Sequence, residues 1–129
     1  MTTAWSHLPN ASHIDRIIAD TQANPDKWRA VARTTATDIS DDAWDAAWDA
    51  AWDTRGAARD DAATAACDAA WDTRGGARSA INALVAYDDC AHLLDNDPEH
   101  VRLMALLGSD AAILLYPACV ALNKQRELV

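Results

Sequence analysis

The chain has 129 residues, a formal net charge of -9 at pH 7 and a pI near 4.6. A chain of this length is expected to form a single domain (1–129), and its negative charge argues against direct binding to nucleic-acid phosphates or to anionic membranes. Half of the residues are apolar, but alanine dominates and phenylalanine is absent, so we expect a core of Trp, Leu, Ile and Val with alanines at close helix contacts.

An N-terminal arm and two short helices are predicted at the start of the chain. Residues 1–10 contain a proline-asparagine break and show no helical periodicity, which indicates an arm or irregular turn. Isoleucines at helical spacing predict a first helix from residue 11 to about residue 21. Asn24 as N-cap and Pro25 at the first helical position predict a second helix, so that the pair occupies residues 11–36.

The long central segment, residues 40–94, carries the most regular pattern in the sequence. Its first part repeats Trp-Asp-Ala-Ala and places Trp44, Trp48 and Trp52 four residues apart. A four-residue period is close to one helical turn, so the tryptophans share one face and drift by about 40° per step. Ser40 is a suitable N-cap for this helix.

The central segment also contains an internal repeat that bears on where the helix breaks. The octet WDTRGAAR at 52–59 recurs as WDTRGGAR at 71–78. A single helix through residue 94 would be about 80 Å long, which is too long for a domain of this size. We considered breaks near Gly56 and near Gly75-Gly76, and favour the second, with Asp60-Asp61 as a further break point. Residues 79–94 are predicted to form one more helix.

The C-terminal helices are predicted within residues 97–124. Asp97 as N-cap and Pro98 at the first position start one helix, which Gly108 ends. The last helix, 111–124, is hydrophobic almost all round and is therefore expected at the centre, with Pro117 kinking or dividing it. No segment alternates as a strand does. The predicted fold is all-α, a compact helical bundle of five to six helices built around a long Ala/Trp-rich central helix.

Acidic residues near the start of the central segment form what we call the aspartate ridge: Asp38, Asp41, Asp42, Asp45, Asp49 and Asp53. Residues 38–53 contain no lysine or arginine, although like charges four residues apart repel by roughly a few tenths of a kcal/mol per pair. The ridge is therefore predicted to bind a basic groove of a partner protein and to stand in for nucleic-acid phosphates. The alternatives are a solvated helix face and a compositional bias of the source genome.

Two roles are open for Trp44, Trp48 and Trp52. Packing against alanine-rich neighbours in the core is the favoured one. Exposed tryptophans at this spacing would instead form an aromatic interface with a partner or with a second copy in a homodimer. Arg55 and Arg59 follow on nearly the same side of the helix as Trp48 and Trp52. We therefore expect a guanidinium to stack on an indole at the C-terminal end of this row of tryptophans.

Metal chemistry has one candidate cluster, and we predict neither a metal nor a cofactor. Asp88 and His92 would lie one helical turn apart and could share a metal with Glu99 or His100 of the next helix. A small metal-dependent all-α hydrolase would hold Mg²⁺ between carboxylates on two helices, for which the sequence offers Asp68, Asp72, Asp88 and Asp89. No nucleophile and base are arranged for catalysis, so an enzyme is the less favoured reading.

Residues 43–59, which read AWDAAWDAAWDTRGAAR, resemble small Ala/Trp/Asp/Arg-rich helical proteins of phages and mobile elements. The segments YDDCAHLLD at 87–95 and LMALLG at 103–108 add to this resemblance, which extends over residues 40–122. It implies a mobile-element context, in which small acidic proteins often inhibit host defence nucleases. It implies no catalytic residue.

Several features predict a cytoplasmic protein, and the resemblance implies that its host is a bacterium. The three cysteines are widely separated, and the N-terminus lacks the basic and apolar regions of a signal peptide. The longest apolar run, 111–122, is shorter than the ~20 residues of a membrane span. The predicted function is a non-enzymatic acidic inhibitor, anti-CRISPR-like or anti-restriction-like, that covers a basic surface of its target. The alternatives are the hydrolase and a structural or oligomerisation module.

Overall fold

The computed structural model describes residues 3–35, 38–70 and 76–127, and this part of the chain contains helices and turns but no strand. The all-α prediction is confirmed. Seven α-helices are present among the described residues, rather than five to six: α1 (Ala11–Ala23), α2 (Pro25–Thr35), α3 (Asp41–Arg55), α4 (Asp60–Ala70), α5 (Gly76–Ala86), α6 (Pro98–Leu106) and α7 (Asp110–Glu127). Two short 3-10 helices, η1 (Ala57–Arg59) and η2 (Ala91–Asp95), follow α3 and α5.

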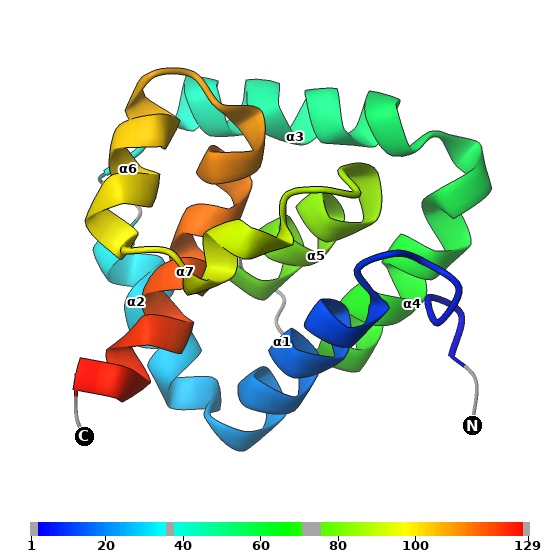
Figure 1. The fold of residues 1–129 in the computed structure, drawn as a ribbon, viewed down its shortest axis with the longest axis horizontal. Coiled ribbons are helices and arrows are strands. Elements are labelled where there is room, and N and C mark those ends of the chain that lie inside the picture. Colours follow the sequence, from blue (N-terminus) through cyan, green and yellow to red (C-terminus); the bar gives the residue numbers. More distant parts are fainter. Residues whose placement is uncertain (1–2, 36–37, 71–75, 128–129) are drawn as a thin grey trace.

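The helix at the centre of the arrangement is α7. It packs against α2, α3, α5, α6 and η2, which confirms the central position predicted from its apolar surface. Pro117 lies inside α7 without dividing it. The Ala/Trp-rich helix α3, which the sequence places at the centre, instead runs along one edge of the molecule (Figure 1). Its composition explains this position, because α3 has only one apolar face and α7 has apolar residues nearly all round.

The central segment leaves the helical path at Gly56. This residue has φ 62° and ψ -177°, a backbone conformation that is essentially restricted to glycine. Arg55 therefore ends α3, η1 turns the chain, and α4 starts at Asp60. The structure thus has a break at Gly56, which was considered but not favoured from the sequence, while the favoured break at Gly75-Gly76 adjoins residues that the structure does not describe. Residues 71–75, which include Trp71 and Gly75, lie outside the described residues, and α5 starts at Gly76.

The helix predicted over residues 79–94 is also shorter in the structure. α5 ends at Ala86, and the chain continues through a turn into η2. The reason is a contact from the N-terminal arm. The side-chain amide of Asn10 is buried and donates to the backbone oxygens of Leu84 and Tyr87, both at 2.9 Å. These bonds satisfy carbonyl groups that a continuing helix would otherwise pair.

The core consists of aliphatic side chains and many alanines, and the tryptophans contribute unequally. The largest fully buried side chains include Ile14, Ile81, Leu84 and Leu114. Trp5 and Trp28 are buried, whereas Trp52 is 51% exposed. The expected core of Leu, Ile and Val is therefore confirmed, but tryptophan is a smaller part of it than predicted. None of the helices in the described ranges is both long and apolar enough to cross a membrane.

Alanines bring α3 against its neighbours. Ala47 and Ala51 are fully buried on the inner face of α3, which packs on α7 and α5. Because alanine has only a methyl group, the helix axes can approach closely at this contact. The contact orients α3, since the opposite face must then point to solvent.

We expect Ala47→Leu to lower the free energy of unfolding by about 1–3 kcal/mol, because the larger side chain overpacks a closed helix contact. Urea unfolding measures the change. Ala46→Leu is the matched control, since Ala46 is exposed on the same helix, and it should alter stability by no more than about 0.5 kcal/mol. Equal effects of the two substitutions would contradict the packing described here.

Candidate partner-binding face

The first turn of α3 has the capping predicted from the sequence. Ser40 has an extended backbone (φ -64°, ψ 150°), and its hydroxyl accepts a hydrogen bond from the amide of Ala43 at 3.2 Å. Asp41 and Asp42 lie in the first turn, where their charges complement the positive end of the helix dipole. The helix that presents the aspartate ridge is therefore well defined at its N-terminal end.

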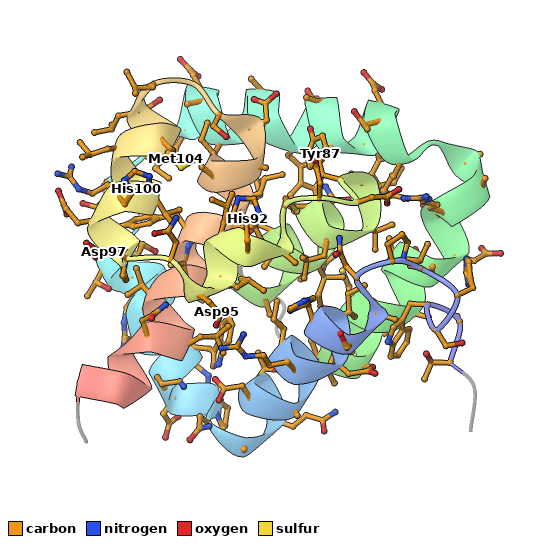
Figure 2. The ribbon with its side chains drawn as sticks, viewed as in Figure 1. Tyr87, His92, Asp95, Asp97, His100 and Met104 are labelled. Atoms are coloured by element: carbon orange, nitrogen blue, oxygen red, sulfur yellow. The ribbon has the colours of Figure 1, made fainter. Side chains whose placement is uncertain are left out.

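The members of the aspartate ridge that lie on α3 are all exposed: Asp41, Asp42, Asp45, Asp49 and Asp53. Within the described residues, none of these carboxylates has a lysine, arginine or histidine partner, although other aspartates such as Asp20 and Asp88 are ion-paired. Side chains tipped with oxygen line the outer edge of α3 in Figure 2. This edge therefore carries a row of unneutralised negative charges.

Helix geometry explains why the aspartates face outward. At 100° per residue, Asp49 lies roughly 160° to 200° around the axis from Ala47 and Ala51. Burial of the two alanines against α7 and α5 therefore turns the carboxylates toward solvent. The exposure of the ridge follows from the alanine contact.

Asp38 differs from the other members of the ridge. It precedes α3, is partly buried, and accepts a hydrogen bond from the hydroxyl of Tyr116 on α7 at 2.9 Å. This contact ties the start of α3 to the central helix. Asp38 thus has a structural partner, and the free carboxylates of the ridge are the five on α3.

The three tryptophans of α3 occupy different environments. Trp44 and Trp48 are half-buried and stack on each other, with ring centroids 5.0 Å apart and planes at 27°. Trp52, one step further around the helix, is mostly exposed, and the guanidinium carbon of Arg55 lies 3.9 Å from its ring centroid. Because the four-residue period drifts around the helix, successive tryptophans lie progressively further from the core and closer to solvent.

The expected stacking of a guanidinium on an indole is confirmed for Arg55. Arg59 has another role. One of its terminal nitrogens donates to the backbone oxygen of Val85 and to the carboxylate of Asp88, each at 2.7 Å. The two arginines that follow the ridge in the sequence thus turn toward α5 and the residues after it.

The proposed ligands of a metal do not come together. Asp88 is paired with Arg59, and His92 does not lie one helical turn from it, because the chain has left α5 before Asp88. Figure 2 shows His92 on η2 and His100 on α6. Glu99 is ion-paired with Arg102. Across the described residues no three His, Cys, Asp or Glu side chains gather as metal ligands. Asp72, a candidate Mg²⁺ ligand, lies outside the described residues.

The cysteines are free thiols. Cys90 and Cys119 are buried, and burial, aided by the nearby charge of Asp89, raises the pKa of Cys90 to about 12. Burial also raises the pKa of Cys67. A thiol with a raised pKa stays protonated near neutral pH, so neither Cys67 nor Cys90 has the properties of an activated nucleophile.

Comparison of the chain with models of protein families, with curated proteins and with solved structures found no match.

The hydrogen bond between Tyr116 and Asp38 makes the free energy of unfolding depend on pH in the alkaline range. Burial and donation to the Asp38 carboxylate raise the pKa of Tyr116 from 10.0 to about 12. Because the folded pKa exceeds the unfolded one, this contribution is complete below pH 10 and is lost as the pH approaches about 12. We expect Tyr116→Phe to abolish this part of the pH dependence in urea unfolding, and to cost about 1 kcal/mol near neutral pH.

Asp38→Asn is the matched variant for the titration itself. It removes the negative charge beside the hydroxyl, so the pKa of Tyr116 should fall toward its usual value. The chain has only two tyrosines, so tyrosinate absorbance of the Tyr87→Phe background reports Tyr116 alone. Titration of Tyr116 near pH 10 in that background, with Asp38 intact, would contradict the contact.

Proposed function

We propose that the protein is a non-enzymatic binding protein that places the α3 carboxylates of the aspartate ridge in a basic groove of a partner. The observation that carries this proposal is the row of five exposed aspartates without a cationic partner in the described part of the chain. Elsewhere in the molecule, aspartates such as Asp20 and Asp95 pair with lysine or arginine. A groove lined with lysine and arginine would supply the missing partners.

The spacing of the carboxylates supports mimicry of a nucleic-acid strand. With a rise of 1.5 Å per residue, aspartates four positions apart lie about 6 Å apart along α3. This separation is of the same order as that between successive phosphates of a nucleic-acid strand. The repulsion between these carboxylates slightly destabilises the free helix, and a cationic groove would relieve it. The spacing and the mutual repulsion of the carboxylates therefore both suit a protein that binds in a site that normally holds nucleic acid.

The resemblance to proteins of phages and mobile elements favours a particular class of partner. A nucleic-acid-binding complex of a host defence system, of the CRISPR or restriction type, has a basic groove that such a protein would block. On this proposal the protein acts in the bacterial cytoplasm, and needs neither a cofactor nor direct contact with nucleic acid.

A second candidate is an oligomerisation module. Trp52 is 51% exposed, and Trp44 and Trp48 are half-buried, so this edge of α3 offers aromatic surface for a homodimer. A mass that increases with concentration and returns to that of the monomer in Trp52→Asp would favour this candidate. The metal-dependent hydrolase has less support, because Arg59 and Arg102 neutralise Asp88 and Glu99.

We expect the triple variant Asp45→Lys/Asp49→Lys/Asp53→Lys to lose binding to the partner while keeping its fold, because all three positions are exposed. Wild-type protein captures the partner from a bacterial lysate, and the affinity of the purified pair is then measured at several salt concentrations. Steep weakening with salt and competition by the partner's nucleic acid are expected, because the contacts are between charges.

The matched control is Asp26→Lys/Asp61→Lys/Asp89→Lys, which makes the same change in net charge at exposed positions away from α3. It should retain most of the affinity. Binding by the α3 variant as tight as wild type would end the proposal, and equal losses in both triple variants would show that only the overall charge matters.

A further inference from the structure

A pocket lies between α3, α4 and α5, and none of the carboxylates of the ridge is among the residues that line it. Its walls include Trp48, Trp52 and Arg55 from α3, Cys67 from α4, and Arg78 and Asn82 from α5. It encloses about 360 Å³ of empty space, including the part open to solvent. The space comparable with the volumes of known cavities is only about 70 Å³, below the range of about 300–1,000 Å³ for small-molecule sites, so the pocket has room for a small head group and leaves the rest of a ligand on the surface.

The orientation of the Asn82 side chain is determined by Arg55. The Arg55 Nε donates to the Asn82 Oδ1 at 2.9 Å, and an Arg55 terminal nitrogen donates to Asp60 at 3.0 Å. A guanidinium has no acceptor, so the amide atom that faces Arg55 must be the oxygen. The amide nitrogen of Asn82 therefore points away from Arg55.

This amide nitrogen is a donor without an acceptor. Asn82 is only 3% exposed, and its Nδ2 has no hydrogen-bond partner among the described residues. A buried unpaired donor is unfavourable, and each such group calls for an explanation. An acceptor supplied by a ligand in the pocket would satisfy it.

The other groups of the pocket indicate the chemistry of that ligand. Arg78, an exposed residue whose side chain donates to the Cys67 sulfur, supplies positive charge beside the pocket. The indoles of Trp48 and Trp52 supply flat apolar walls. Asp68, also exposed and part of the lining, disfavours a second negative charge on the ligand.

We propose that this pocket binds a small organic monocarboxylate, whose oxygen accepts a hydrogen bond from the Asn82 amide and whose apolar body lies against the indoles of Trp48 and Trp52. Arg78 contributes charge attraction from the rim. The site is separate from partner binding by the aspartate ridge, and either function can exist without the other.

Benzoate and hexanoate serve as probes, one with a flat body and one with a flexible body. Binding is measured by NMR, through the side-chain amide resonances of Asn82, and by the change in tryptophan fluorescence. We expect a dissociation constant on the order of 1 mM for the better probe, as suits a ligand of this size. Benzamide, which lacks the charge, and inorganic phosphate, which lacks the apolar body, should each bind about tenfold more weakly or worse.

Asn82→Asp is the decisive variant. The aspartate still accepts the hydrogen bond from Arg55, but the free donor is replaced by a negative oxygen, so carboxylate binding should fall by about tenfold or more. Arg78→Gln, at an exposed position, should also weaken binding and reduce its salt dependence. Arg33→Gln, an equally exposed charge change on α2, should leave binding unaltered.

Several results would overturn the proposal. The first is absence of binding by both probes to the wild-type protein. The second is equal binding of benzoate and benzamide. The third is wild-type affinity in Asn82→Asp. If Asn82→Asp does not fold, Arg78→Gln decides, since unchanged affinity and salt dependence in that variant would also exclude the site.

Discussion

The close contact of α3 with α7 and α5 through Ala47 and Ala51 determines the arrangement of the candidate face. Both alanines are fully buried, so the opposite side of the helix must face solvent. The carboxylates of α3 occupy that side because they follow the same four-residue period. A larger residue at either alanine would push α3 away from the core, and the aspartates would then no longer lie along one fixed edge.

Polar contacts between residues far apart in the sequence hold the ends of helices in place. The Asn10 amide donates hydrogen bonds to the backbone oxygens of Leu84 and Tyr87 at the end of α5. The Tyr116 hydroxyl donates to Asp38 just before α3. Asn123 on α7 donates in the same way to the backbone oxygen of Leu94 at 3.1 Å. Each contact satisfies a partly or fully buried polar group, which would otherwise lower the stability of the fold.

Within the described residues, lysine and arginine pair with several aspartates outside α3 but with none on it. Arg55 and Arg59, the first basic residues after the ridge, bind Asn82 and Asp88, and neither pairs with a carboxylate of α3. The ridge is left without counter-ions on its own helix, and the buried guanidinium of Arg55 orients the Asn82 amide. One short segment thus influences both the charged face and the pocket, because its arginines are directed inward.

Local signals in the sequence were sufficient for the helical class and for several helix boundaries. The starts at Pro25 and Pro98 and the cap at Ser40 depend on residues within a few positions, and so could be predicted. The exposure of the α3 aspartates was also foreseeable, since it follows from the period of the pattern.

Tertiary structure decided the remaining features, because they depend on partners distant in the chain. Gly56 was one of several plausible break points until the packing of α3 and of α4 on α5 selected it. The early end of α5 depends on Asn10, and the separation of Asp38 from the free carboxylates depends on Tyr116. The unpaired amide of Asn82 becomes visible only when Arg55 is placed beside it, since spacing along a helix says nothing of which buried donor lacks an acceptor.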